Sequence, residues 1–331
     1  MKSPIRIPHS KPCLAEEEVE AASAVLRSGM LAQGREVAAF EAECAAFTGH
    51  RHGVAVNSGT AALHLALIAL GVDEGHRVAM PAYACAALPQ AVSWQRARPL
   101  PCDVDENYNL DPALVPADAD AVIVVHCMGA QADAPRHARM IEDLAQSLGG
   151  PSIGATVAIA SFYATKLCTT GEGGMVLTDD GGMAELLRDL RDYDNRDDFR
   201  VRYAYKMTDL QAAIGRVQLR RLPGFIARRK ELAQRYTEAF SALPLRLPEG
   251  RDHIYFRYAP ATPQREALAK HLAERGVDAK RPVYRPIHLD FGGVCPRADA
   301  AHDQVLSLPC YPALTDEESE YVIESVQSFF D

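Results

Sequence analysis

The chain has 331 residues, of which 48% are hydrophobic and 24% are charged, a balance typical of a globular protein with one large or two smaller domains. Its formal charge of −9 comes from 35 basic and 44 acidic residues, and the acidic residues are scattered along the chain. These values argue against nucleic acid or an anionic membrane as a partner, and no segment reaches the length of about 18 apolar residues that a bilayer span requires.

The N-terminal sequence and the cysteines both predict a cytoplasmic location. Residues 1–12, MKSPIRIPHSKP, contain no apolar run after the basic residues, so no secretory signal is expected. None of the eight cysteines forms a CxxC pair, which predicts buried, reduced thiols and neither disulfides nor a metal site. They occupy positions 13, 44, 85, 102, 127, 168, 295 and 310. The basic cluster at 220–230 is expected to be a solvated helix face.

Helical and strand patterns alternate through the first half of the chain. Residues 35–47 repeat apolar side chains at helical spacing, and residues 52–70 predict a short strand, a turn and an apolar helix. Residues 137–150 combine a helix-forming stretch with the apolar-acidic step Ile141-Glu142-Asp143. Further strands are predicted within 76–84, 118–129, 156–166 and 173–180. Such alternation predicts an α/β fold with a mostly parallel sheet that is covered on both faces.

The second half predicts a connecting helix and a smaller domain. Residues 207–240 form one long helical region that Pro223 is expected to interrupt. Beyond it we expect short strands at 253–261 and helices at 265–276 and 315–330, the last with a Thr315/Glu318 capping box. We therefore predict a large domain of residues 1–230 and a small α+β domain of residues 231–331.

The turn before the apolar helix of residues 52–70 contains Asn57, Ser58, Gly59 and Thr60. A strand that ends in such residues places free backbone N–H groups and hydroxyls at the positive end of a helix dipole, where a phosphate can bind. An ordinary N-cap by Ser58 or Thr60 explains the same residues. This pattern alone does not decide between the two.

Lys166 stands in SFYATKLCTTGEGG, residues 161–174, among hydroxylated residues and glycines that cannot neutralise it. A lysine that loses its hydration has a lowered pKa and can attack carbonyl groups, whereas a surface lysine with a solvated amine is the commoner case. Asp143, an acidic residue expected at the end of a buried strand, favours the first interpretation. An amine, a carboxylate and an anion site together are what pyridoxal 5′-phosphate requires.

Longer motifs resemble the DegT/DnrJ/EryC1/StrS sugar aminotransferase family, nearly from end to end. They include VNSGTAALHLAL, IEDLAQSLG, SFYATK, GEGGMVLTDD, YKMTDLQAAIGRVQLRRL and VLSLPCYPALTDEESEYVIESV. The resemblance implies the aspartate-aminotransferase-like fold, fold type I of pyridoxal-phosphate enzymes, with a large domain and a smaller C-terminal domain. It also implies a homodimer with its sites at the subunit interface.

The resemblance also implies roles for individual residues. Lys166 would form the Schiff base with the cofactor and Asp143 would pair with its pyridinium nitrogen. Gln146 would contact the phenolic oxygen side of the ring, and Thr60, Ala61 and Ser161 would hold the phosphate. The full set of implied cofactor-binding residues is Gly59, Thr60, Ala61, Cys85, Asp143, Gln146, Ser161 and Lys166.

The chain departs from the family pattern at three places. Cys85 stands where most relatives have an aromatic residue that stacks on the cofactor ring, and the stretch between Gly150 and Ser161 is short. Ala204 replaces a common asparagine that reaches the cofactor phosphate of the partner subunit, a loss for which Tyr205 or Lys206 could compensate. These changes concern cofactor affinity and substrate more than reaction class.

Several other residues are weaker candidates. His126 ends a predicted strand and either lines the site or is a structural histidine. Tyr284, Arg285 and His288 match the substrate region of the family, and Arg285 suits a carboxylate or a diphosphate. The acidic run at 192–198 lacks the pattern of a calcium loop, so it is expected to be a solvated loop.

The resemblance implies a pyridoxal-phosphate aminotransferase that acts on a keto-sugar, most simply a nucleotide-linked one, with L-glutamate as the amino donor. Two alternatives stay open. One is a regulatory protein that binds the cofactor without turnover, and the other is an enzyme of the same fold that aminates a cyclitol or dehydrates its substrate.

Overall fold

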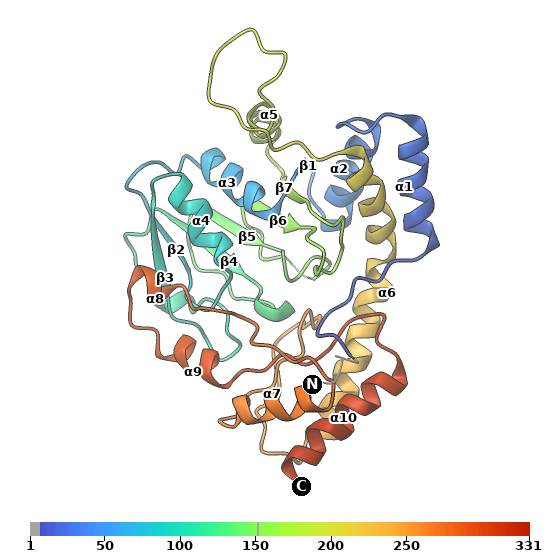
Figure 1. Cartoon of the computed structure of the whole chain (residues 1–331). Coiled ribbons are helices and arrows are strands. Elements are labelled where there is room, and N and C mark those ends of the chain that lie inside the picture. The colour runs from blue at the N-terminus through green and yellow to red at the C-terminus, as the bar shows by residue number, and fades with distance from the viewer. Residues whose placement is uncertain (1–6, 151) are drawn as a thin grey trace.

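The computed structural model describes residues 7–150 and 152–331 (Figure 1). The expected absence of a secretory signal concerns residues 1–12, the first six of which lie outside the described residues. In the part of the chain that is described, no helix is both long enough and apolar enough to span a membrane.

A seven-stranded sheet forms the centre of the N-terminal part of the chain. Its strands are β1 (His52–Val56), β2 (Arg77–Pro81), β3 (Arg98–Cys102), β4 (Ala121–Val125), β5 (Met140–Asp143), β6 (Val157–Ser161) and β7 (Gly174–Thr178). Their order is β1-β7-β6-β5-β4-β2-β3, and only β7 runs antiparallel to its neighbours. The predicted mostly parallel sheet is confirmed. Six strands therefore end at one edge of the sheet, and β7 begins there.

Helices cover both faces of the sheet (Figure 1). One face packs against α3 (Gly59–Ala69), α4 (Ala87–Trp94) and α5 (Gly181–Leu190), and the other against α2 (Arg35–Thr48) and α6 (Asp209–Phe240). Alternation along β1 shows the division, since Val54 and Val56 join the first core and Ala55 joins the second. Helix α1 (Glu16–Ser28) packs on α6.

The predicted interruption of the long helix at Pro223 is wrong. Helix α6 is continuous over 32 residues with Pro223 inside it. A proline inside a helix costs about 3 kcal/mol, but the buried neighbours Leu222 and Phe225 anchor the helix on both sides of it. The domain boundary predicted at residue 230 falls within α6 and stays a prediction.

The helical stretch expected within residues 137–150 is wrong, whereas the buried strand expected to end at Asp143 is confirmed. Residues 140–143 form β5, which pairs with β4 on one side and β6 on the other. All four residues are buried. Pairing with two neighbouring strands outweighs the local helical preference of so short a segment.

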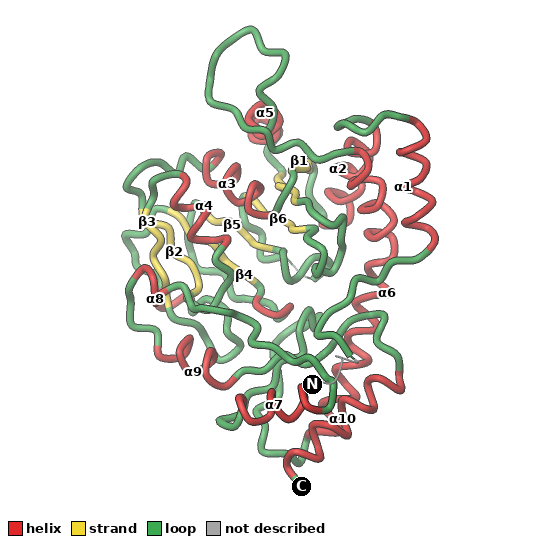
Figure 2. The backbone as a smooth tube through the Cα atoms, viewed as in Figure 1, coloured by secondary structure: helices red, strands yellow, loops and turns green. Residues whose placement is uncertain are grey.

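The C-terminal part contains α7 (Arg265–Glu274), α8 (His288–Phe291), α9 (Pro296–Gln304) and α10 (Asp316–Phe330). The strand expected at 253–261 is wrong, because this segment makes only isolated bridges, and Figure 2 draws it as loop. Tyr255 has a φ of 53°, which interrupts the extended backbone. The capping box of α10 is confirmed, since Glu318 N donates to Thr315 Oγ1 at 3.1 Å and Thr315 N donates to Glu318 Oε2 at 3.0 Å.

The cysteines, the basic cluster at 220–230 and the acidic loop at 192–198 differ in how far they follow the sequence predictions. All eight cysteines are free and six are buried, whereas Cys85 is exposed and Cys13 is half-buried. The solvated face expected at 220–230 is wrong for Arg229, which is buried and donates to the backbone carbonyls of Phe256 and Cys310. The acidic loop at 192–198 is exposed, as expected.

Candidate active site

A cavity of about 300 Å³ opens at the edge of the sheet where β4, β5 and β6 end. Seven of the eight residues that the sequence assigned to a cofactor line it: Gly59, Thr60, Cys85, Asp143, Gln146, Ser161 and Lys166. Ala61, the eighth, is buried in the first turn of α3 and does not line it. The cavity wall also includes Tyr163 and Glu172, which the sequence did not single out.

The N-terminus of α3 provides an anion cradle in this cavity. Ser58 caps the helix, since Ala61 N donates to Ser58 Oγ at 3.1 Å. The backbone N–H groups of Gly59 and Thr60 have no acceptor among the described residues. The cap and the anion site are therefore compatible, because the cap uses only one of the N–H groups at the positive end of the helix dipole.

Two glycines allow the helix to approach the strands this closely. A Cβ on Gly59 would lie 2.7 Å from Ser161 Cβ, and a Cβ on Gly174 would overlap the backbone carbonyl of Ser58. Gly174 is paired with Ser161 on one side and Val56 on the other. Gly174, the last of the glycines that follow Lys166 in this loop, therefore serves close packing of α3 onto β6 and β7.

Lys166 lies in the loop that follows β6. Its backbone N–H donates to Tyr163 O at 2.8 Å, and Thr170 N donates to Phe162 O at 2.9 Å, so the loop folds back on itself. Burial lowers the pKa of Lys166, and the nearby carboxylate of Asp143 opposes part of this shift. The hydroxyls of Thr169 and Thr170 bond to backbone carbonyls, so they do not solvate the amine.

Asp143 is buried at the end of β5, on the wall of the same cavity. Burial raises its pKa, and a hydrogen bond from Ala145 N to Oδ1 at 2.8 Å works in the opposite direction. No ion pair joins Asp143 to Lys166 among the described residues. The carboxyl therefore has capacity for a further donor.

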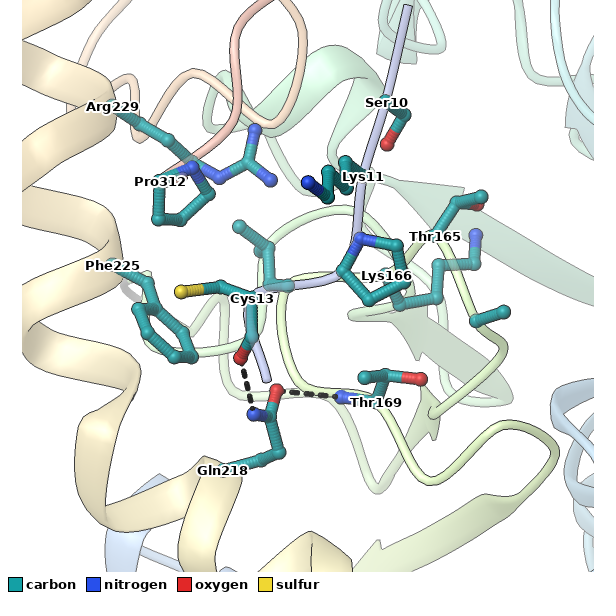
Figure 3. Close-up of a pocket in the computed structure, with 13 residues that line it drawn as sticks. Ser10, Lys11, Cys13, Thr165, Lys166, Thr169, Gln218, Phe225, Arg229 and Pro312 are labelled. Carbon is teal, nitrogen blue, oxygen red and sulfur yellow. Dashed lines mark hydrogen bonds between the residues drawn. The ribbon is translucent and has the colours of Figure 1, made fainter. Parts of the chain in front are cut away.

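A small pocket of about 10 Å³ lies beside the Lys166 loop (Figure 3). Gln218 of α6 connects its walls, because its amide donates to Cys13 O at 2.9 Å and accepts from Thr169 N at 3.4 Å. These bonds tie the N-terminal segment and α6 to the loop that carries Lys166. Lys11, Lys166 and Arg229 line the pocket, and its lining has no acidic side chain.

His126 has a structural role. It does not line the cavity, and its Nδ1 accepts from Ala132 N at 2.9 Å. Its Nε2 therefore carries the proton and donates to Glu142 Oε1 at 2.9 Å. Glu142 also accepts from Ser152 Oγ at 2.7 Å and from Ile153 N at 3.0 Å, which completes a buried network behind β5.

The three candidate substrate residues do not reach the cavity within one chain. Tyr284 is 91% exposed, Arg285 is paired with Asp290 at 2.9 Å, and His288 lies 2.9 Å from Asp299. Their proposed role stays a prediction.

The residues around Ala204 are already engaged within the chain. Lys206 Nζ lies 2.8 Å from Asp192, and the hydroxyl of Tyr205 lies 3.1 Å from His64 Nδ1. The backbone carbonyl of Ala204 accepts from Asn57 Nδ2 at 3.1 Å. Neither Tyr205 nor Lys206 is therefore free, in one chain, to replace the missing asparagine.

The residues around the cavity fit pyridoxal 5′-phosphate. Lys166 offers an amine of lowered pKa, Asp143 offers a buried acceptor, and the unpaired N–H groups of Gly59 and Thr60 offer a phosphate site. The cavity is at the lower end of the size range of small-molecule sites.

Comparison with known proteins agrees with this geometry. Residues 12–327 match the family model described as the DegT/DnrJ/EryC1/StrS aminotransferase family. The chain is 37% identical to the erythromycin biosynthesis sensory transduction protein EryC1 of Saccharopolyspora erythraea, over 93% of this chain and 94% of that one. It is 36% identical to the dTDP-3-amino-3,4,6-trideoxy-alpha-D-glucose transaminase of Streptomyces venezuelae, over 94% and 92% of the two chains.

Solved structures show the same likeness. The structure of S. venezuelae DesV in complex with a ketimine intermediate superposes with a TM-score of 0.89 at 34% identity, over 96% of this chain and 95% of that one. The PLP-form of Spr1654 from Streptococcus pneumoniae gives a TM-score of 0.89 at 25% identity, over 97% of this chain and 98% of that one. The chain therefore belongs to the DegT/DnrJ/EryC1/StrS family and is a pyridoxal-phosphate-dependent aminotransferase of fold type I.

Proposed function

We propose that this aminotransferase transfers the amino group of L-glutamate to a keto-sugar that is linked to a nucleotide. The similarity to a dTDP-amino-sugar transaminase over nearly the whole chain supports the substrate class. The observation that carries the proposal is that Lys166 and Asp143 line one cavity. Burial there lowers the pKa of Lys166 and raises the pKa of Asp143.

Bound pyridoxal phosphate supplies an aldehyde for amines and an electron-withdrawing ring that stabilises negative charge on the carbon next to the nitrogen. We assign two tasks to Lys166. Its amine would hold the cofactor, and the same amine, once released, would accept and donate a proton at the substrate carbon. The lowered pKa suits this second task, because a proton acceptor must be neutral.

We assign Asp143 to the ring nitrogen, where a protonated donor would complete the partners of the buried carboxylate. Burial alone raises the pKa of Asp143, but a protonated ring nitrogen beside it would favour the carboxylate, which would in turn help to hold the proton on the ring. Gly59, Thr60 and Ser161 are assigned to the phosphate. Gln146 Oε1 already accepts from Met128 N at 2.8 Å, so its amide N–H groups are the ones that can turn toward the ring.

A homodimer is part of the proposal. The loop between α5 and α6 projects from the body of the molecule (Figure 1). It presents Phe199, 99% exposed, and Val201, 68% exposed. Apolar side chains on a projecting loop are suited to burial against a second copy. Size-exclusion chromatography with light scattering tests this, and a monomer at micromolar concentration contradicts it.

A cofactor-binding protein without turnover is the second candidate. Two relatives carry the names sensory transduction protein and pleiotropic regulatory protein. In this chain, the exposed Cys85 in the cavity wall covers less of a bound ring than an aromatic residue would.

Adding L-glutamate to the purified protein loaded with pyridoxal phosphate distinguishes the two candidates. An aminotransferase should lose its visible absorption band as the cofactor accepts the amino group, whereas a protein that binds the cofactor without turnover should keep the band. A panel of nucleotide-linked keto-sugars and keto-cyclitols, assayed for amine product, then identifies the acceptor. Amination of cyclitols alone would contradict the nucleotide-linked sugar as substrate. Release of water without an amine product would contradict amino transfer to that sugar.

A further inference from the structure

One face of α6 contacts the loop that carries Lys166. Gln211, Gly215 and Gln218 lie four and three positions apart, so they share one side of the helix and are called the α6 face below. The side-chain amide of Gln211 donates to Glu172 O at 2.9 Å, on the C-terminal side of the loop. The long helix therefore holds the loop through groups on a single face.

Gly215 allows the loop to approach α6 closely. A Cβ at this position would lie 2.8 Å from Thr170 Cγ2, which is closer than side-chain carbons pack. The carbonyl of Gly215 accepts a weak hydrogen bond from the buried thiol of Cys168, with 3.8 Å between sulfur and oxygen. At this point the loop therefore rests directly on the backbone of α6.

Gln218 is buried, and its amide is bonded at both ends. Its Nε2 donates to Cys13 O at 2.9 Å and to Glu18 Oε1 at 2.7 Å, which uses both N–H groups. These bonds turn Oε1 toward the loop, where it accepts from Thr169 N at 3.4 Å (Figure 3). Turning the amide over would place its oxygen against two acceptors and its N–H groups against a donor, so a single orientation satisfies the network.

The partners of Gln218 are themselves held in place. Glu18 of α1 is buried and accepts from Arg221 Nη1 at 2.6 Å, which belongs to α6 as well. The segment that leads to Cys13 is anchored at Ile7, whose N–H donates at 3.0 Å to the backbone of the turn that follows α7. Gln218 therefore joins the loop to α1, to α6 and to the C-terminal part of the chain at one point.

We propose that Gln218, supported by Gln211 and Gly215, is a positioning residue that keeps the amine of Lys166 within reach of the substrate carbon. This inference rests on the proposed function, in which that amine first holds the cofactor and then moves a proton. Both tasks require the backbone of the loop to stay in place while the lysine side chain moves. Gln218 and Lys166 line the same small pocket, so a loosened wall acts on the lysine directly. A displacement of about 1 Å can slow a reaction by about 100-fold.

The first test uses the full chain without cofactor and does not depend on catalysis. Acetic anhydride modifies neutral amines, and mass spectrometry of the peptide that contains Lys166 gives its rate of modification at each pH. Burial lowers the pKa of Lys166. In Gln218→Met the amine should reach water more easily, so the midpoint of modification should rise by about 1 pH unit. Asp143, Cys85 and Arg257 also act on this pKa, and the variant changes none of them.

The second test measures proton transfer in the protein loaded with pyridoxal phosphate. Loss of the visible band at saturating L-glutamate should slow by about 30-fold or more in Gln218→Met. Deuterium on the α-carbon of the donor should slow the variant by a larger factor than the wild type, because proton transfer to a displaced amine limits its rate. The affinity for pyridoxal phosphate should stay within about threefold of the wild type, because the residues assigned to the phosphate are unchanged.

Tyr236→Phe is the control for a general loss of stability. It removes a buried hydrogen bond of the same helix, from the Tyr236 hydroxyl to Pro309 O at 2.9 Å, about five helical turns from Gln218. It should lower the midpoint of chemical denaturation without changing the modification of Lys166 or the isotope effect. A modification midpoint in Gln218→Met no higher than in Tyr236→Phe, or an unchanged isotope effect, would overturn the assignment.

Gly215→Ala provides a second route if Gln218→Met does not fold. The new Cβ would press on Thr170 and displace the loop, so the modification midpoint should rise here too, whereas Gly224→Ala, with no neighbour within 4 Å on the same helix, should match the wild type. Equal midpoints in the two variants would overturn the role of the α6 face. A wild-type protein that reacts with no amino acid would overturn the proposed function instead, and the modification of Lys166 would still test Gln218.

Discussion

Charged residues are held in opposite ways at the cavity and in the loop between α5 and α6. At the cavity, Lys166 and Asp143 form no ion pair. Burial lowers the pKa of Lys166 and raises the pKa of Asp143, so it favours the neutral form of each. In the loop, Lys206 lies 2.8 Å from Asp192, and the hydrogen bond between them raises the pKa of Lys206. Burial without pairing favours a neutral amine that can react, whereas pairing with a carboxylate keeps the amine of Lys206 charged.

The largest expected effect is that of Lys166→Ala. Without this amine, the cofactor has no covalent anchor and the proton has no carrier, so turnover should fall by at least about 10⁴-fold. Borohydride treatment of the wild-type holoenzyme should fix the cofactor to the protein, and the variant should carry no label. Lys206→Ala, in the paired loop, is the control and should be labelled normally. If borohydride fixed the cofactor to another residue of the Lys166→Ala variant, the assignment of Lys166 as its covalent anchor would be contradicted.

Asp143→Asn should have the next largest effect. An amide cannot stabilise a protonated ring nitrogen, so turnover should fall by about 10³-fold while the cofactor stays bound. The measurements are steady-state kinetics and the visible spectrum. Asp192→Asn makes the same chemical change in a paired, half-buried carboxylate that does not line the cavity, and it should leave turnover within about twofold of the wild type. Equal effects of the two variants would remove Asp143 from the mechanism.

Gly174→Ala should destabilise the packing that forms the phosphate site. The added Cβ would overlap the Ser58 carbonyl, and such overpacking costs about 1–3 kcal/mol. Gly224→Ala is a matched control within α6, where the new Cβ has no neighbour within 4 Å and should add up to about 1 kcal/mol of stability. Chemical denaturation measures both. A Gly174→Ala variant as stable as the wild type would show that α3 can move away from β7 freely.

The smallest effect concerns the buried network behind β5 and its response to pH. Burial alone would raise the pKa of Glu142, but hydrogen bonds from His126, Ser152 and Ile153 outweigh it and lower the pKa below its ordinary value of 4.5. Stability from a lowered carboxyl pKa is present above the ordinary value and is lost as the pH falls through the folded-state pKa.

Ser152→Ala should therefore cost about 1 kcal/mol at pH 7 and less below pH 4, where the wild type also loses the interaction. Thermal unfolding at several pH values provides the comparison. A cost that grows as the pH falls would contradict the sign of the pKa shift. Turnover should not change, because Glu142 does not line the cavity.

The amino-acid sequence by itself identified the class of fold and most of the cavity wall. Strands that alternate with helices specify a parallel sheet, and residues at the ends of its strands must meet at one edge. Asp143 and Ser161 end strands β5 and β6, whereas Ser58 to Thr60 and Lys166 stand in the segments that follow β1 and β6. Their meeting therefore follows from local patterns and the rule for parallel strands.

Only the tertiary structure could decide which charges remain unpaired. Arg285 and Arg257 look alike in sequence, but the first is bonded to Asp290 on the surface and the second lies on Phe256 beside Lys166. In the same way, packing kept α6 continuous through Pro223. Burial and partner choice depend on segments far apart in the chain, because desolvation and packing are set by whatever the fold places nearby.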